Sequence, residues 1–195
     1  MMSGRGFFRP RLVPARERPE ADADRFRRIM LPHMDAAYNY ARHLTRDGTA
    51  AEDVVQDAFV RALRGFDGWR GDNPKAWLLA IVRNCHLDTV IRRQDPLRGA
   101  EPVEAIDACE AVAAQPQIGL AQRSDAEMLR RTIEGLPEPF REALVLRELE
   151  ELSYKEIAAI TLVPIGTVMS RLARARTMLA ALLLPPDEQA REARS

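Results

Sequence analysis

The chain has 195 residues, of which 46% are hydrophobic and 30% are charged, as in a globular protein of one domain or two small ones. Its 29 basic and 29 acidic residues cancel, so any nucleic-acid-binding surface requires that charge be segregated along the chain. Cys85, Cys109 and the three histidines do not stand at metal-ligand spacing, and no apolar run has the length of a signal peptide or a membrane span. These features argue against a disulfide framework, a zinc site or a bound cofactor, and they predict a cytoplasmic protein.

An all-α fold is expected, because Ala, Leu, Arg and Glu dominate and alternating β-branched runs are almost absent. Residues 1–24 are rich in Pro and Arg and have no periodicity. They predict a flexible basic arm, which either contacts nucleic acid or has no role of its own. Residues 25–93 predict a first helical domain, which opens with a helical stretch to about Thr45 that breaks at Pro32.

The next predicted helix covers residues 50–64 and is opened by a capping box of Thr49 and Glu52. Its apolar residues share one side, while Asp53, Asp57 and Arg64 lie along another. Acids at the start and arginines at the end suit the helix dipole. This pattern fits an ordinary surface helix as well as an interaction face.

A loop over residues 65–73 combines three glycines, two aromatic residues and one arginine. Asn73 followed by Pro74 then predicts the start of a helix that runs to about Arg93. An aromatic loop beside a helix bearing Arg83 and Asn84 could stack on and hydrogen-bond to single-stranded bases. The alternative is that the aromatics only fill the core, which is the favoured reading for Trp77.

Residues 94–123 carry three prolines and five acids against two arginines, and they predict a flexible acidic linker. A second helical domain is expected over residues 124–184. It starts with a capping box of Ser124 and Glu127, and it contains helices over residues 125–134 and 138–149. A charged tail follows at residues 185–195.

Residues 152–176 predict two helices joined by a tight corner. Ser153 and Glu156 form a capping box for the first helix, and the pattern breaks between Thr161 and Pro164. The second helix buries one apolar stripe, and its opposite face is short, polar and positive, with Thr167, Ser170, Arg171 and Arg174. Such a face suits the major groove of DNA. The plainer alternative is an amphipathic hairpin with a solvated basic face.

Two separated segments together resemble the extracytoplasmic-function (ECF) sigma factors of bacterial RNA polymerase. The first contains the runs AEDVVQDAFVRA at residues 51–62 and WLLAIVRN at residues 77–84. The second contains Leu136-Pro137 and the runs LSYKEIA at residues 152–158 and PIGTVMSRLARAR at residues 164–176. The resemblance implies a helical region 2 domain and a region 4 helix-turn-helix domain, joined by the acidic linker.

The resemblance also implies what each segment contacts. Core RNA polymerase would be bound by Asp53, Gln56, Asp57 and Arg61. The minus-ten promoter element would be melted and read as a single strand by the loop and the helix after it, through Trp69, Arg70, Asn73, Arg83 and Asn84. The minus-thirty-five element would be read as duplex by Thr167, Met169, Ser170, Arg171 and Arg174.

Two residues depart from the family's pattern. Leu162 stands at the helix-turn-helix corner, where glycine is usual and the backbone is left-handed, and Met169 stands where a basic residue is common. Members of this family are commonly held inactive by an anti-sigma protein, often at the inner membrane face, so the resemblance implies such a partner here. No small-molecule substrate is implied, and no catalytic set of residues points to an enzyme. Two alternatives stay open: a helix-turn-helix regulator that acts without polymerase, and a sigma-like adaptor that has lost promoter recognition.

Overall fold

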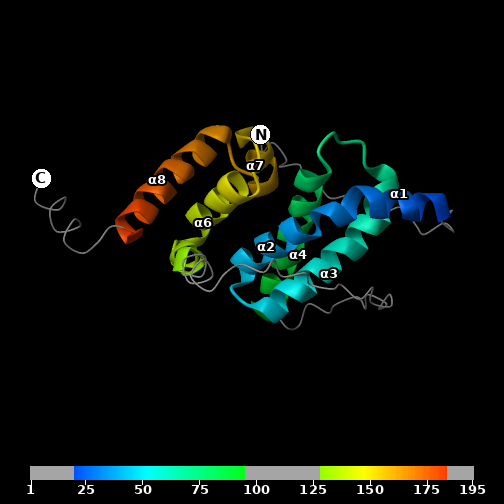
Figure 1. The fold of residues 1–195 in the computed structure, drawn as a ribbon, viewed down its shortest axis with the longest axis horizontal. Helices are drawn as coiled ribbons and strands as arrows, with labels where there is room; N and C mark the ends of the chain where they lie inside the picture. Colours follow the sequence, from blue (N-terminus) through cyan, green and yellow to red (C-terminus); the bar gives the residue numbers. More distant parts are fainter. Residues whose placement is uncertain (1–19, 95–127, 184–195) are drawn as a thin grey trace, which may run out of the picture.

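The computed structural model describes residues 20–94 and 128–183, and every regular element within these two ranges is helical (Figure 1). Helices α1 to α4 form one domain and helices α6 to α8 form the other (Figure 1). The expected all-α fold with two helical domains is therefore confirmed. The predicted basic arm as far as residue 19, the acidic linker from residue 95, the capping box of Ser124 and Glu127, and the charged tail lie outside the described residues.

The N-terminal domain opens with α1 (Glu20–Met30), a 3-10 turn (Leu31–His33) and α2 (Met34–Thr45). The turn contains Pro32, so the predicted break is confirmed. Helix α1 starts at Glu20, earlier than expected, so residues 20–24 belong to the helix and not to the predicted arm. Acidic residues near the start of the helix interact favourably with the positive end of the helix dipole, and Asp24 also forms an ion pair with Arg27 at 3.0 Å.

Helix α3 (Gly48–Gly65) follows after a sharp corner. Arg46 ends α2 in a left-handed conformation, with φ 59°. The cap of α3 is then Asp47, whose side chain accepts a hydrogen bond of 2.9 Å from the backbone N–H of Ala50. The predicted capping box of Thr49 and Glu52 was therefore wrong. Asp is as good a cap as Thr, and the tight corner at Arg46 puts Asp47, and not Thr49, at the start of the helix.

The predicted loop contains a short 3-10 turn (Phe66–Gly68) and leads into α4 (Pro74–Gln94). Asn73 caps α4, since its Oδ1 accepts a hydrogen bond of 3.1 Å from the N–H of Ala76. Helix α4 packs on both α2 and α3 and carries the fully buried Leu78, Leu79 and Val82. It is thus the central helix of the domain.

In the C-terminal domain residues 128–134 are helical, followed by α6 (Glu138–Leu144), α7 (Tyr154–Thr161) and α8 (Ile165–Leu183). Helix α6 continues into a π-helical turn (Val145–Leu149). The two elements together match the helix expected over residues 138–149. The buried residues of this domain include two charged ones, Arg141 and Glu142, whose burial the helical periodicity did not predict. The Arg141 guanidinium donates to the carbonyl oxygens of Glu134 and Leu136, so it satisfies backbone at the end of the preceding helix.

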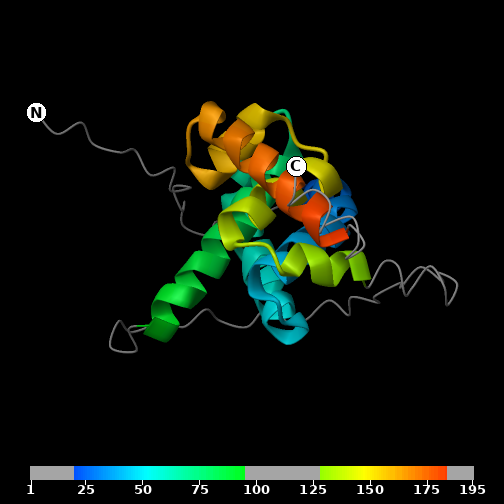
Figure 2. The ribbon, with the colours of Figure 1, turned by 90° about the vertical axis from the view of Figure 1, so that its left-hand side faces the viewer.

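The two domains lie directly against each other, with α7 on α4 and α6 on α2. Buried apolar side chains of both domains form one continuous core. Figure 2 shows the C-terminal end of α4 projecting beyond the contact, so the interface uses the N-terminal half of that helix. In the part of the chain that the structure describes, no single helix is long and apolar enough to cross a membrane, and only the bent pair α7–α8 passes on length and composition together.

Candidate nucleic-acid interface

Helices α7 and α8 form the expected helix-turn-helix, with a bend of 101° between them. The predicted capping box is confirmed: Ser153 accepts from the backbone N–H of Glu156, and the Glu156 carboxylate accepts from the N–H of Ser153 at 2.8 Å. The corner residue Leu162 has φ 57° and ψ 38°, the left-handed conformation expected for it. Its N–H and that of Val163 both donate to the carbonyl of Ala158, which closes the end of α7.

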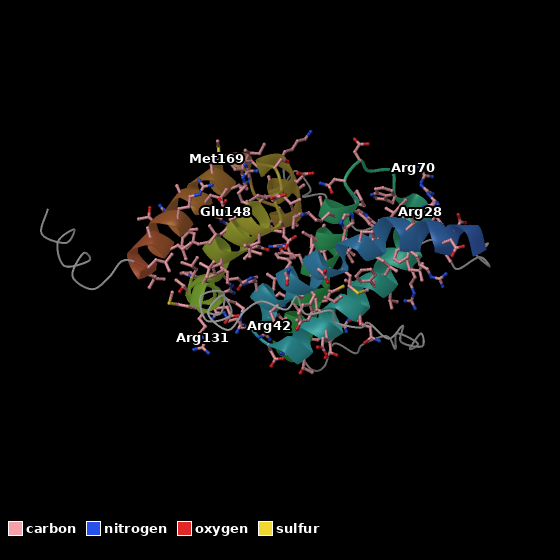
Figure 3. The ribbon with its side chains drawn as sticks, in the orientation of Figure 1. Arg28, Arg42, Arg70, Arg131, Glu148 and Met169 are labelled. Atoms are coloured by element: carbon pink, nitrogen blue, oxygen red, sulfur yellow. The ribbon has the colours of Figure 1, made fainter. Side chains whose placement is uncertain are left out.

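The spacing predicted a buried stripe of Ile165, Val168, Leu172, Ala175 and Leu179 on α8. Val168, Leu172 and Ala175 are buried, whereas Leu179 is half-buried and Ile165, at the start of the helix, is exposed. The opposite side presents Met169, Ser170 and Arg174 to solvent, with Thr167 and Arg171 half-buried at its edge. Figure 3 shows Met169 projecting outward from the molecule. Among the described residues, neither Arg171 nor Arg174 has a carboxylate within ion-pair distance, so both guanidinium groups can accept a partner.

The loop after α3 is built on stacked aromatic side chains. Phe66 is buried and stacks on Trp69, with ring centroids 5.9 Å apart. The Trp69 ring in turn packs at a tilt against Trp77, with ring centroids 6.2 Å apart. Arg25 of α1 lies over the Phe66 ring at 5.2 Å. Phe66 therefore belongs to the core, while Trp69 is half-buried at the rim of the loop.

An open pocket of about 540 Å³ lies between α1 and this loop, lined by Asp22, Arg25, Asp67, Trp69, Arg70 and Gly71. Arg70 shapes the loop itself, since its Nη1 donates to the backbone carbonyls of Asp67 and Trp69. The indole Nε1 of Trp69 is buried and has no hydrogen-bond partner among the residues that the structure describes, and a Cβ added at Gly71 would lie 3.0 Å from it. The pocket combines an aromatic wall with two guanidinium groups and two carboxylates. An aromatic wall beside a cation is the chemistry that stacks on and holds an unpaired base.

The other three residues predicted for the minus-ten element do not line this pocket: Asn73 caps α4, and Arg83 and Asn84 lie on that helix. Asn73 donates from Nδ2 to the Glu156 carboxylate at 2.6 Å, and Arg83 donates from Nε to the Glu142 carboxylate at 2.7 Å. Asn84 is half-buried further along the helix. Thus Trp69 and Arg70 are brought together at the pocket, whereas Asn73 and Arg83 face the C-terminal domain.

The residues predicted to bind polymerase share one side of α3. Asp53 and Gln56 are exposed, and Asp57 is half-buried. Arg61 is also half-buried, and its Nη1 donates to Asp88 Oδ2 of α4 at 2.6 Å. Asp88 therefore fixes the direction of Arg61. The neighbouring Cys85 is buried, which raises the pKa of its thiol to about 12 and leaves it protonated and unreactive.

Sequence reasoning missed the polar groups that join the domains. Tyr40 is fully buried, and its hydroxyl donates to the Glu142 carboxylate at 2.9 Å. Burial, reinforced by the Glu142 charge, raises the pKa of Tyr40 well above its ordinary value. Burial likewise raises the pKa of Glu150, although the ammonium of Lys75 at 3.5 Å opposes the shift. The only signals in the sequence were the Tyr40 hydroxyl and the Glu142 carboxylate, each next to the apolar side of its own helix. Neither residue type shows which distant segment supplies its hydrogen-bond partner.

Comparison with known families adds independent findings. Residues 29–95 match the family "Sigma-70 region 2", and residues 126–179 match "Sigma-70, region 4". The chain is 40% identical over 131 residues to the ECF RNA polymerase sigma-E factor of Escherichia coli K12, covering 64% of this chain and 69% of that protein. It is 34% identical over 161 residues to the ECF RNA polymerase sigma factor EcfG of Rhodopseudomonas palustris TIE-1, covering 82% of this chain and 86% of that protein.

Two solved structures are similar across both domains. The sigma factor RpoE of Bartonella quintana, in complex with the anti-sigma factor NepR, aligns with a TM-score of 0.63 at 29% identity, covering 82% of this chain and 97% of that one. CnrH in complex with the cytosolic domain of CnrY aligns with a TM-score of 0.58 at 28% identity, covering 84% of this chain and 92% of that one.

Proposed function

The chain belongs to the ECF sigma factors of bacterial RNA polymerase, a family of promoter-specific transcription initiation factors, and from this premise we propose how its residues divide the work. The C-terminal domain reads the minus-thirty-five element as duplex, the N-terminal domain opens and reads the minus-ten element, and α3 binds core polymerase. The observation that carries this proposal is the α8 face, where Arg171 and Arg174 stand without a carboxylate partner in the described part of the chain.

Reading of the minus-thirty-five element is assigned to the exposed side of α8. Arg171 and Arg174 lie one turn apart, a spacing that suits contacts to guanine edges and phosphates in the major groove. Ser170 and Thr167 can contact phosphates or bases beside them. Met169 is 52% exposed, and its apolar side chain suits a thymine methyl group better than an acceptor-rich guanine.

Reading of the minus-ten element is assigned to the pocket beside Trp69 and Arg70, together with Asn73 at the cap of α4 and Arg83 and Asn84 on that helix. Unstacking a base costs a few kcal/mol. Stacking of that base on an aromatic side chain recovers about 1–3 kcal/mol. Trp69, held from behind by Phe66 and Trp77, is a rigid surface for such stacking.

Polymerase binding is assigned to Asp53, Gln56, Asp57 and Arg61 on α3. The first two are exposed, and the pairing of Arg61 with Asp88 holds its guanidinium in place before binding. A pre-formed face loses little side-chain entropy on association. We also infer a cytoplasmic protein that is regulated by an anti-sigma factor, because a similar sigma factor was solved with such a partner. Sequestration at the inner membrane face follows if that partner is tethered there.

The α8 assignment is tested by transcription from a linear promoter template with reconstituted core polymerase. Arg174→Ala is expected to lower transcript yield about tenfold or more, since one good major-groove contact is worth about 1–3 kcal/mol. The matched control is Arg176→Ala, two residues along the same helix, whose guanidinium is paired with Glu148 at 2.6 Å. Equal losses in the two variants would contradict the assignment. Tight promoter binding by the chain without polymerase would instead favour a regulator that acts alone.

A further inference from the structure

Three large apolar side chains are exposed at the start of the helix that is proposed to read duplex DNA. Leu162 at the corner is 54% exposed, Ile165 in the first turn of α8 is 45% exposed, and Met169 in the second turn is 52% exposed. We call these three side chains the apolar strip. A group of exposed apolar side chains on a folded domain marks a surface that binds a partner.

The strip adjoins the polar side of α8. Ile165 and Met169 are four residues apart and therefore lie along one side of the helix. Ser170 follows Met169 directly, and Arg174 lies one turn beyond Ser170. Met169 itself projects outward from the molecule (Figure 3). The apolar and the polar side chains thus form one continuous surface over the N-terminal half of α8.

Leu162 occupies the corner against a backbone preference. Its φ of 57° and ψ of 38° are left-handed, a conformation that glycine adopts freely and other L-residues do not. More than half of the side chain is exposed, so packing in the free protein does not explain why a leucine stands here. Backbone strain that persists at an exposed position points to a function of the side chain.

We propose that the apolar strip reads thymine methyl groups in the major groove of the minus-thirty-five element. The C5 methyl of thymine is the apolar group that base pairs present in that groove. The N-terminal residues of a recognition helix are the ones that contact base edges there. The inference rests on the proposed function of α8, and it adds Leu162 and Ile165 as specificity-determining residues beside Met169.

The charge around the strip suits a polyanion better than a protein surface. Residues 157–183 contain three arginines and no acidic residue. Among the described residues, Arg171 and Arg174 have no carboxylate within ion-pair distance. Such guanidinium groups pair with phosphates or guanine edges and hold the helix in the groove, while the strip faces the neighbouring base edges.

The strip changes which sequences the helix prefers. An arginine favours guanine, whereas an apolar side chain gains affinity only where a methyl group meets it. Burial of one methyl group changes binding about threefold. Leu162 and Met169 are also the two residues that depart from the family's pattern. The minus-thirty-five element of this protein should therefore carry thymines on adjacent base pairs, which relatives without these side chains do not need.

The test isolates the methyl group by replacing thymine with uracil, which pairs in the same way and lacks only that group. The template is a linear promoter that carries the strongest start site found on genomic DNA with core polymerase and the wild-type protein. Each thymine of the minus-thirty-five element, on either strand, is replaced singly, and the minus-ten element is left unchanged. Transcript yield at subsaturating holoenzyme gives the ratio of thymine to uracil template at each position.

The protein variants remove the strip one side chain at a time. They are Ile165→Ala and Met169→Ala on the helix and Leu162→Gly at the corner. Met169→Leu keeps an apolar side chain of similar size and is the conservative variant. The matched control is Met178→Ala, because Met178 is a 37% exposed methionine of the same helix. It lies nine positions after Met169 and so on the opposite side of α8, at about 100° per residue.

The wild-type protein is expected to give about threefold more transcript from thymine than from uracil at two or more adjacent positions. Each alanine variant of the strip should abolish the difference at one position and leave it at the others. Leu162→Gly should do so at the position closest to the corner. Met169→Leu and Met178→Ala should keep the wild-type ratios, whatever their overall yields.

Equal yields from thymine and uracil templates at every position would overturn the proposal and would favour a protein partner for the strip. Unequal yields that no strip variant changes would also overturn it, because the methyl effect would then come from DNA shape. Loss of the ratios in Met178→Ala as well would show a general change in the domain and would count against the strip. An upstream element without adjacent thymines would contradict it before any base is replaced.

Failure of the proposed function would look different from failure of the strip. No start site would then depend on the protein, and the assignment of the strip to promoter DNA would be refuted together with the function on which it rests.

Discussion

A strong coupling between the domains is expected between Tyr40 and Glu142. The two residues are 102 positions apart in the chain and are joined by a buried hydrogen bond of 2.9 Å. We expect a double-mutant cycle of Tyr40→Phe and Glu142→Gln to give a coupling energy of about 1–2 kcal/mol.

The magnitude follows from burial and charge. Tyr40 is 0% exposed, and a hydrogen bond to a charged group contributes about 1.5–3 kcal/mol, so Tyr40→Phe alone should cost about 2 kcal/mol. Glu142→Gln leaves the Arg83 guanidinium without a counter-charge, and removal of one partner of a buried pair costs about 3–5 kcal/mol. The residual exposure of Arg83 places the expected loss near the lower end of that range.

The assay is urea unfolding of the four proteins of the cycle, followed by circular dichroism. With an m-value of about 2 kcal/mol/M, the loss in Tyr40→Phe corresponds to a midpoint shift of about 1 M. The reference cycle is Glu148→Gln with Arg176→Ala, an exposed pair expected to couple by less than about 1 kcal/mol. Additivity of the Tyr40 and Glu142 substitutions within about 0.5 kcal/mol would refute the reasoning.

Three further predictions concern other parts of the chain. Leu162→Gly removes the strain of a left-handed conformation that costs an L-residue about 1–2 kcal/mol, but the greater freedom of Gly in the unfolded chain offsets part of that gain. Thermal melting should therefore show a change in the free energy of unfolding between zero and about +1 kcal/mol. A loss above about 1 kcal/mol would contradict this and would mean that the Leu162 side chain, although 54% exposed, makes stabilising contacts. Burial lowers the pKa of His43, whose Nδ1 has no hydrogen-bond partner in the described part of the chain; the Glu134 charge opposes this shift and the Arg141 charge adds to it. The unfolded chain then takes up the proton first, so stability should fall as pH drops below about 6.5, and His43→Gln should flatten the pH profile of the melting temperature; an unchanged profile would exclude His43 as the cause. Gly71→Ala forces Trp69 to move, so tryptophan fluorescence should shift and transcription should fall severalfold, whereas Gly68→Ala, with open space around it, should leave both unchanged.

Local features of this protein could be predicted from sequence, because their causes lie within a few residues. The capping box of Ser153 and Glu156, the Asn73 cap and the break at Pro32 follow from short-range chemistry. The left-handed corner at Leu162 was expected only from the resemblance to the family, because local chemistry disfavours Leu in that conformation. The cap of α3 was missed, since Asp47 and Thr49 are both good caps and only the corner at Arg46 selects between them.

The domain contact could not be predicted for a different reason. Helical periodicity assigns residues to a buried or an exposed side, but it does not say which distant side chain covers a buried polar group. Glu142 and Arg83 are charged residues on helices of different domains, and their side chains, 6% and 16% exposed, pair with each other where the domains meet. The same contact explains why Asn73 and Arg83, expected at a DNA site, are found on protein partners instead.

The role of the chain in promoter-specific initiation is tested most directly by sequencing the transcripts that core polymerase makes on genomic DNA with and without this protein. We predict new start sites that appear only with the protein and that share two upstream elements, one at each of the positions assigned to α8 and to the loop after α3. Start sites that are identical with and without the protein, or new sites that share no such pair of elements, would contradict it.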